Sequence, residues 1–312
     1  MNNKSLTNFA YFGSKGKLMK ELNEFIENGS GGCHTFIDGF GGSGAVTINV
    51  DKYMFNKRII NDLNPRLYLI HKTLSNTKTA YKVLDLVYKT QLSQKYFFKA
   101  KKTWETYEKV IQEFENEMLK TTDAAEFENQ KDMWKKYIPE EKAIELAAAA
   151  LVIFKQSFNG LGKQPKPEYS GNEDLQYDKW INSTLEKVIE QMEKVEVYCM
   201  NSLVLVNKYK QNPKVFMYLD SPYELKTRGS KNNYEVDMDD EAQLKYINTI
   251  VDAKSRILIS GYKYKGKSIY DKLVESGKWK CAILAEDIPK YSAGSSFGSV
   301  KPRADEWVWY NY

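Results

Sequence analysis

The sequence has few of the residues that build metal sites and disulfides. Its 312 residues include three cysteines and two histidines. Cys33, Cys199 and Cys281 lie far apart in the chain, and with only His34 and His71 available no zinc-type spacing exists. Isolated cysteines of this kind are expected to be reduced thiols in a cytoplasmic protein. A metal-dependent enzyme is therefore disfavoured.

Long apolar runs are also missing. The longest, residues 147–154, is much shorter than the roughly 20 residues that a membrane-spanning helix needs. The N-terminus has no signal-peptide pattern, and no internal repeat or long low-complexity tract is found. These absences predict a cytoplasmic protein that does not bind a membrane.

The composition is that of a globular protein with a modest basic bias. With 312 residues and 42% hydrophobic residues, the chain can bury one large core plus an inserted domain. The net charge is +5, from 46 basic and 41 acidic residues. A polyanionic partner is compatible with that charge, but many soluble proteins share it, so it counts for little.

The most informative feature is the turn Asp220-Ser221-Pro222-Tyr223, which directly follows the apolar run 215–219. Open α/β sheets bind their ligands at the carboxyl ends of such strands. A carboxylate, two backbone carbonyls and an aromatic ring suit the holding of a planar exocyclic amine. Pro222 fixes φ, and Tyr223 offers a ring face on which a base can stack. Taken alone, the four residues are equally consistent with an ordinary turn.

A glycine-rich turn lies far upstream of that motif. Residues 35–37 are expected to form a buried strand, residues 38–44 a turn with four glycines, and residues 45–50 a helix or another tight element. The next strand, residues 58–61, ends in Asp62, about 20 residues beyond the glycines. An acid at this place can accept hydrogen bonds from both hydroxyls of a ribose. The alternative is a carboxylate that caps the following helix.

The chain divides into three parts by pattern. Residues 1–63 alternate helix and strand, residues 64–193 are mostly helical, and strands return after residue 194. Alternating elements interrupted by a helical insertion predict an α/β, Rossmann-like, doubly wound sheet. The expected helices are residues 82–89, 107–119, 141–154, 239–254 and 268–275, and the expected later strands are residues 195–199, 215–219, 256–262, 281–286 and 306–312.

Four blocks, in this order, resemble the α-group DNA adenine-N6 methyltransferases of the Dam type. Residues 11–15 resemble the N-terminal aromatic-x-G-x-K block of that family, and residues 36–44, followed by Asn61-Asp62, resemble its cofactor loop. Residues 157–160 resemble an asparagine-glycine hairpin of the target-recognition region, and residues 220–223 resemble the catalytic D-P-P-Y. The resemblance spans nearly the whole chain, and the ordered set is more specific than any single block.

The resemblance implies S-adenosylmethionine as cofactor and double-stranded DNA as partner, with no metal and no membrane. It divides the chain into a catalytic domain (residues 1–63 and 194–312), built on the methyltransferase sheet, and a target-recognition insert (residues 64–193). It also implies a restriction–modification setting in the cytoplasm of a bacterium or a phage-infected cell. The expected reaction is direct methyl transfer to N6 of an adenine that has rotated out of the duplex.

The same resemblance assigns roles within the catalytic domain. Asp220 is expected to accept one N6–H, and the Ser221 carbonyl the other. Lys15 is expected to contact the carboxylate end of the cofactor, with Tyr11 and Phe40 packing against its other portions. The implied catalytic residues are Asp220, Ser221, Pro222 and Tyr223, and the implied cofactor-binding residues are Tyr11, Gly13, Lys15, Phe36, Asp38, Phe40, Gly41, Asp62, Asn201 and Asp220.

Lysines and arginines beside glycines and prolines supply the expected DNA contacts, with a solvated loop as the plain alternative. Asn159 suits bidentate contact with adenine, and the basic residues suit phosphate contact. The residues assigned to DNA are Phe158, Asn159, Lys163, Lys226, Arg228, Lys231, Lys301 and Arg303. Trp307 and Trp309 alternate within the last strand and are expected in the core.

Two residues depart from the family pattern. Ser221 stands where the family has its first catalytic proline, although serine keeps the main-chain carbonyl that the chemistry needs. Asn201 stands roughly where relatives often carry an Asp. Two other functions therefore stay open: a DNA-binding protein that holds the cofactor with weak or lost methylation, and a cytosine-N4 methyltransferase.

Overall fold

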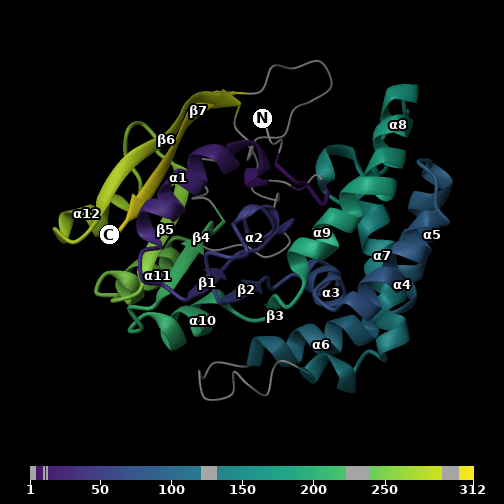
Figure 1. Ribbon diagram of the computed structural model, residues 1–312, viewed down its shortest axis with the longest axis horizontal. Coiled ribbons are helices and arrows are strands. Elements are labelled where there is room, and N and C mark those ends of the chain that lie inside the picture. The colour runs from purple at the N-terminus through teal and green to yellow at the C-terminus, as the bar shows by residue number, and fades with distance from the viewer. Residues whose placement is uncertain (1–4, 10, 12, 121–131, 223–238, 290–301) are drawn as a thin grey trace.

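The computed structural model describes residues 5–9, 11, 13–120, 132–222, 239–289 and 302–312. A seven-stranded sheet fills one side of the molecule and a group of helices the other (Figure 1). The strand order is β3-β2-β1-β4-β5-β7-β6. The strands are β1 (Thr35–Asp38), β2 (Lys57–Asn61), β3 (Glu196–Tyr198), β4 (Val215–Leu219), β5 (Arg256–Tyr262), β6 (Lys280–Pro289) and β7 (Arg303–Tyr310).

The sheet reverses its strand order between β1 and β4. Strands β1 to β5 are mutually parallel, and β7 pairs antiparallel with both β5 and β6. The chain after β1 and the chain after β4 leave the same edge in opposite directions, which opens a ligand-binding crevice there. All five residues of β4 are buried, as expected for a central parallel strand covered on both faces. The predicted doubly wound sheet is confirmed.

Helices cover both faces of the sheet. A short 3-10 turn (Lys15–Leu18), α1 (Met19–Gly29) and α2 (Ala45–Asn49) pack on one face, with Phe36 and Phe216 in the shared core. On the other face lie α10 (Ser202–Tyr209), α11 (Asp240–Ile250) and α12 (Asp271–Glu275). Ile37 and Met217 point to that second face because successive strand side chains alternate. Figure 1 shows α1 and α2 on one side of the parallel strands and α10 and α11 on the other.

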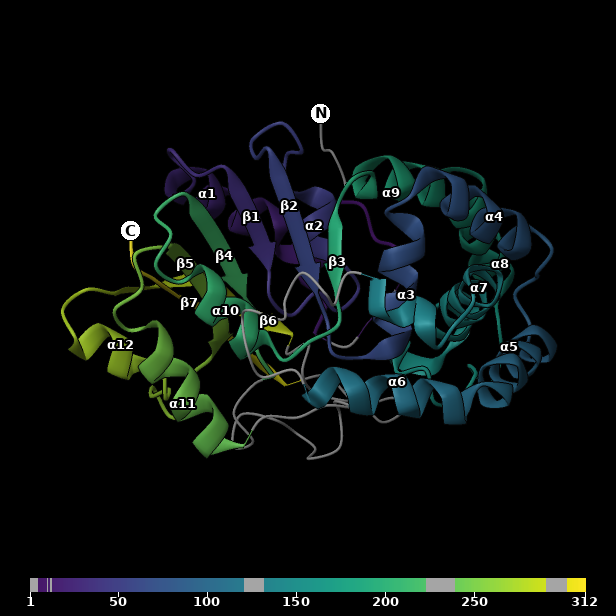
Figure 2. The same cartoon turned by 90° about the horizontal axis from the view of Figure 1, so that it is seen from below.

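The helical part of the chain is inserted between β2 and β3. In Figure 2 these helices form a group beside β3, at the edge of the sheet. The helices are α3 (Pro65–Leu74), α4 (Thr77–Tyr88), α5 (Gln94–Thr106), α6 (Glu108–Lys120), α7 (Glu140–Gln156), α8 (Gly171–Lys179) and α9 (Leu185–Met192), with a π-helical turn over Trp180–Thr184 and a 3-10 turn over Phe158–Gly160.

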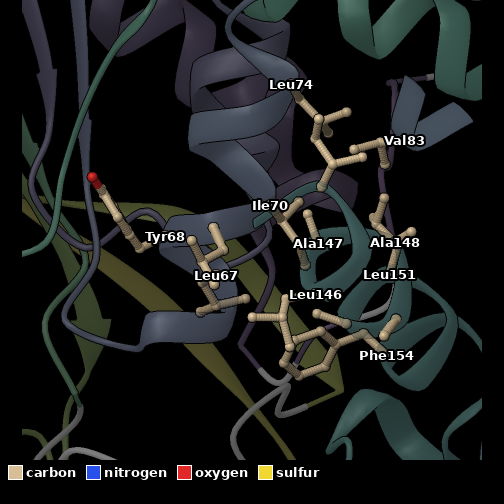
Figure 3. Close-up of a cluster of buried hydrophobic side chains, with 14 of the residues drawn as sticks. Leu67, Tyr68, Ile70, Leu74, Val83, Leu146, Ala147, Ala148, Leu151 and Phe154 are labelled. Atoms are coloured by element: carbon tan, nitrogen blue, oxygen red, sulfur yellow. The ribbon is translucent and has the colours of Figure 1, made fainter. Parts of the chain in front are cut away.

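Helix α7 is the centre of that helical group. The apolar run 147–154 is buried at every position, and so is Leu146 directly before it. Helices α3, α4 and α5 all pack against it. Leu146 and Leu151 of α7 lie with Leu67 and Ile70 of α3 in one cluster (Figure 3). A helix that is apolar all round is a buried core helix in a protein of this kind.

Most predicted elements are present with shifted ends. The helices expected over residues 82–89, 107–119 and 141–154 correspond to α4, α6 and α7. The last strand begins and ends earlier than expected, at Arg303 and Tyr310, and α12 is restricted to five residues. No helix in the described part of the chain is both long and apolar enough to cross a membrane.

Candidate active site

A cavity of about 330 Å³ opens at the point where the strand order reverses. It is lined by residues that follow β1, β2, β3 and β4, together with the segment before α1 and one face of α11. Pockets for small molecules typically have volumes of about 300–1,000 Å³ and lie at such switch points. Six separate segments of the sequence therefore meet around one cavity.

The glycine-rich turn is held in place by hydrogen bonds to β2 and α3. The Gly41 N–H donates to the Asn61 carbonyl at 2.8 Å, and His71 Nε2 lies 2.9 Å from the Gly42 oxygen. Gly44 has φ +74°, and a Cβ there would lie 2.9 Å from the His71 ring, so glycine is required on both counts. Burial lowers the pKa of His71 to about 4. The neutral imidazole thus supports the turn without adding charge beneath the cavity.

Asp62 follows β2 at the predicted place. Its Oδ2 accepts from the Gly42 N–H at 2.7 Å and its Oδ1 from the Asn64 N–H at 2.9 Å. Asn64, not Asp62, caps α3, because its side chain accepts from Arg66 N. Each carboxylate oxygen can accept more than one hydrogen bond, so Asp62 keeps capacity for a ligand hydroxyl.

Asp38, at the end of β1, is a buried carboxyl group on the cavity wall. Thr47 Oγ1 donates to its Oδ2 at 2.9 Å, whereas Oδ1 has no partner among the described residues. Burial, together with the nearby charges of Asp220 and Asp62, raises the pKa of Asp38 to about 7. A buried polar oxygen without a partner is costly, so this position suits a polar group of a bound molecule.

The remaining walls are largely aromatic and apolar. Tyr11 lines one side, and the Phe40 and Tyr246 rings lie 5.9 Å apart on another. Leu203 is also a lining residue. Asn201 caps α10, because its Oδ1 accepts from the Leu203 N–H at 2.9 Å. Apolar walls with a few fixed polar groups are typical of sites for nucleoside-like ligands.

The Asp220 carboxylate, which follows β4, forms an ion pair with a buried lysine. Lys15 Nζ lies 2.6 Å from Asp220 Oδ2 and 3.5 Å from Glu306 Oε1. Ser260 Oγ donates to Asp220 Oδ1 at 2.9 Å. Burial of Lys15 disfavours its charge, but the two carboxylates outweigh burial and raise its pKa. Lys15 therefore stays charged, and Asp220 has a fixed orientation.

The next two residues of the turn are also held by side chains. Ser221 Oγ is hydrogen-bonded to the Tyr270 hydroxyl. Gln243 Nε2 donates to the Pro222 carbonyl at 3.0 Å. Tyr223, the fourth residue of the motif, lies outside the described residues.

Sequence reasoning missed the partners of this turn. Glu306, Ser260, Tyr270 and Gln243 come from β7, β5, the start of α12 and α11. One signal was available: Ser260 interrupts the apolar run of β5, and Glu306 directly precedes the apolar end of β7. Both side chains are fully buried. A buried polar side chain needs a partner, so it points to a contact in the folded protein.

Phe36 is a correction to the predicted cofactor residues. Its ring lies 5.4 Å from that of Phe55 and 6.2 Å from that of Phe216, in the core beneath α1 and α2. It does not line the cavity. Phe36 sits two residues before the end of β1, one pleat inside the sheet, where its side chain cannot reach the crevice. The other predicted cofactor residues, Tyr11, Gly13, Lys15, Asp38, Phe40, Gly41, Asp62, Asn201 and Asp220, all line the cavity.

The candidate DNA-reading segment forms a loop after α7. An antiparallel bridge between Ser157 and Pro165 closes it, around the short 3-10 turn at Phe158–Gly160. The Phe158 side chain is 37% exposed, and Lys163 is exposed. Phe154, at the end of α7, lies 5.6 Å from the ring of Tyr11 on the cavity wall. The loop therefore starts next to the cavity.

Three residues singled out in the sequence, Arg303, Trp307 and Trp309, lie on β7. Arg303 is exposed and forms an ion pair with Asp287 at 2.9 Å. Trp309 is fully buried and Trp307 is partly buried, so the prediction that both belong to the core holds fully for Trp309. The DNA candidates Lys226, Arg228, Lys231 and Lys301 lie outside the described residues. Within the described ranges, no group of three or more His, Cys, Asp and Glu could hold a metal ion.

Comparison with known proteins gives one match. The family model described as MethyltransfD12, D12 class N6 adenine-specific DNA methyltransferase, matches residues 11–283. No curated protein matches the sequence. The matched range contains every cavity residue described above and ends before Glu306 of β7.

Proposed function

Because the chain belongs to the D12 class of N6 adenine-specific DNA methyltransferases, we propose that the cavity and the turn at Asp220 are its active site. The enzyme transfers a methyl group from S-adenosylmethionine to N6 of adenine in DNA. The single observation that carries the site assignment is the convergence on one cavity of Asp38, Asp62 and Asp220, each at the carboxyl end of its strand.

The cavity residues fit the cofactor. Asp62 would accept from both ribose hydroxyls, and its existing bonds to Gly42 and Asn64 support this role because they fix its rotamer. The partnerless oxygen of Asp38 suits a cationic donor of the methionine portion. Phe40 and Tyr246 provide apolar contact area. When bound, S-adenosylmethionine supplies an electrophilic methyl carbon on its sulfonium.

Asp220 and Ser221 hold the target amine. One carboxylate oxygen of Asp220 accepts an N6–H, and the Ser221 carbonyl accepts the other. These two bonds would favour a tetrahedral nitrogen and free its lone pair for attack. Lys15 and Ser260 fix the carboxylate at 2.6 and 2.9 Å before the substrate arrives. Such preorganisation of polar groups around a developing charge is a main source of rate enhancement.

The DNA partner, the helical insert and the cellular setting complete the proposal. The partner is double-stranded DNA, from which the target adenine rotates into the cavity, because N6 cannot reach the methyl carbon inside a duplex. Residues 64–193 act as the target-recognition insert, since α7 leads from the cavity wall at Tyr11 to the loop that carries Phe158, Asn159 and Lys163. Cytoplasmic restriction–modification in a bacterium or phage-infected cell remains the predicted setting.

The two alternatives are less well supported. The family description specifies N6 of adenine, against a cytosine-N4 enzyme. Against a DNA-binding protein that has lost methylation, Asp220 keeps two bonded oxygens, and the hydroxyl of Ser221 is bonded too. A decayed catalytic turn would not be expected to retain partners from several elements.

The test is transfer of tritium from labelled S-adenosylmethionine to DNA, with analysis of the modified nucleoside. Asp220→Ala should reduce the single-turnover rate at least about 100-fold, the scale of losing one preorganised polar contact. Asp220→Asn, which preserves shape, guards against a folding defect. Asp252→Ala, at an exposed acid paired with Lys278, is the matched control. An Asp220→Ala enzyme that methylates at nearly the wild-type rate would remove the turn from the active site.

A further inference from the structure

The residues of the catalytic turn are each held by a different partner. Asp220 is held by Lys15 and Ser260, and the Pro222 carbonyl by Gln243. Between them lies Ser221, which is 3% exposed. Its hydroxyl is hydrogen-bonded to the hydroxyl of Tyr270, a contact that spans 49 residues of sequence.

Ser221 occupies the position at which the Dam-type pattern has a proline. A proline ring fixes φ, so it restrains the backbone that carries the amine-accepting carbonyl. A serine leaves φ free and adds a hydroxyl that needs a partner once it is buried. The hydrogen bond to Tyr270 meets both needs. It gives the buried Ser221 hydroxyl a partner, and it restrains the position of Ser221.

Tyr270 is well anchored. It is 4% exposed, and its ring lies 5.3 Å from the ring of the fully buried Trp309. Asp271, the next residue, accepts from Trp309 Nε1 at 3.1 Å, from Ser268 N at 2.9 Å and from Lys263 at 2.9 Å. The start of α12 is therefore tied to β7, and the Tyr270 hydroxyl is held at the back of the catalytic turn.

We propose that Tyr270 is a positioning residue that holds the Ser221 carbonyl in place for the target amine, through its hydrogen bond to the Ser221 hydroxyl. In this chain the pair replaces the backbone restraint of the family's proline. The inference rests on the proposed role of Asp220 and Ser221. It predicts that Ser221→Pro lowers activity although it restores the family pattern, because the proline deprives the buried Tyr270 hydroxyl of its Ser221 partner.

A double-mutant cycle tests the proposal. The variants are Tyr270→Phe, Ser221→Pro and the combination of both, each assayed for single-turnover methyl transfer at saturating DNA and cofactor. We expect Tyr270→Phe to lower the rate about 10-fold, the kinetic equivalent of losing one hydrogen bond. Ser221→Pro alone should also be slow, and the double variant should return to within about 3-fold of wild type, since contacting residues are coupled.

Further measurements separate positioning from general stability. The dissociation constants for cofactor and DNA should stay within about 2-fold of wild type in Tyr270→Phe, because the bond holds the turn and not the ligands. Ser221→Ala removes the same bond from the other side and should match the Tyr270→Phe rate. Tyr312→Phe removes a hydroxyl bonded to the Phe25 carbonyl at 2.9 Å, away from the cavity, and should keep the wild-type rate.

Two results would overturn the inference. One is a Tyr270→Phe or Ser221→Ala enzyme with wild-type turnover. The other is a double variant that is slower than either single variant, since additive losses mean that the two positions act independently. Failure of the proposed function gives a different result: Asp220→Ala would then keep its activity. If Asp220→Ala is inactive while the cycle is additive, only the role of Tyr270 is wrong.

Discussion

The three acidic side chains around the cavity have different surroundings, which suit different parts of the proposed function. Asp220 has both oxygens bonded to side chains of the protein, Asp62 has both bonded to backbone N–H groups, and Asp38 has one oxygen without a partner among the described residues. The fixed orientation of Asp220 suits its proposed catalytic role, and the surroundings of Asp62 and Asp38 suit their proposed contacts with the hydroxyls and the cationic end of the cofactor.

Asp62 allows a direct test of cofactor binding. Asp62→Ala should weaken S-adenosylmethionine binding by about 1.5–3 kcal/mol, the range for hydrogen bonds to a charged group. Calorimetric titration measures the change. Asp51→Ala is the matched control, because Asp51 also accepts a backbone N–H, from Tyr53 at 2.9 Å, but lies on the exposed surface. Unchanged affinity in Asp62→Ala would remove this residue from the site.

Lys15 is expected to contribute strongly to stability. Lys15→Met leaves Asp220 and the fully buried Glu306 without their shared cation, and breaking a buried ion pair typically costs about 3–5 kcal/mol. The free energy of unfolding in urea should fall by that amount. Lys17→Met, at an exposed lysine two residues away, should change it by less than about 0.5 kcal/mol. A loss below about 1 kcal/mol for Lys15→Met would show that the two carboxylates do not depend on Lys15.

At the scale of elements, α7 links the loop at residues 157–165, the proposed DNA-reading loop, to the cavity. Phe154, in the last turn of α7, contacts Tyr11, and Gly162 of the loop packs back on Phe154, where a Cβ would lie 3.1 Å from the ring. The Ser157 hydroxyl accepts from the Gly162 N–H at 3.1 Å. The loop is therefore built as one unit with the end of α7, and its position is set relative to the cavity.

This arrangement predicts distinct effects for two loop residues. Asn159→Ala should relax or abolish the choice of methylation site while leaving cofactor affinity unchanged, because an amide can read adenine. Lys163→Ala should weaken binding of all DNA sequences alike and reduce the salt dependence, as expected for a phosphate contact. Mapping of modified adenines and binding titrations at several salt concentrations measure both. An Asn159→Ala enzyme that methylates the same sites at the same rates would exclude this residue as the reader.

At the scale of the whole molecule, two buried groups give opposite pH dependences of stability. His71 has its pKa lowered by burial from 6.5 to about 4, so between these values the unfolded chain binds a proton that the native protein does not. Stability from this group falls as the pH drops. Asp38 has its pKa raised, chiefly by burial, from 3.8 to about 7, so the native protein holds the extra proton and stability falls as the pH rises.

The two slopes overlap between about pH 4 and 6.5 and should largely cancel. Each proton contributes at most about 1.4 kcal/mol per pH unit. Asp38→Asn should therefore make the free energy of unfolding rise with pH across this range relative to wild type, and His71→Gln should make it fall. Urea titrations at three pH values measure the slopes, with His34→Gln as the control for loss of an exposed imidazole. Identical slopes in all variants would mean that neither group is buried as described.

The sequence by itself determined the order of the functional blocks and the outline of the fold. Apolar runs ended by Asp38, Asp62 and Asp220 predicted buried strands with acids at their carboxyl ends, because strand patterns and turn residues are local signals. The apolar helix 141–154 and the helical insert were predicted for the same reason. Phe36 was assigned to the cofactor because it belongs to a motif that is recognised locally in the sequence. The depth of its side chain within the sheet depends on tertiary packing, which the motif does not show.

Only the tertiary structure decided which distant residues complete the catalytic turn. Lys15 and Asp220 are separated by 205 residues, and Ser221 and Tyr270 by 49. Their contacts depend on the order in which strands pair, on β7 entering the sheet between β5 and β6, and on the packing of α12 against it. No local pattern encodes these neighbours. The free-energy cost of burying a lysine or a serine is offset only after folding brings its partner within hydrogen-bonding distance.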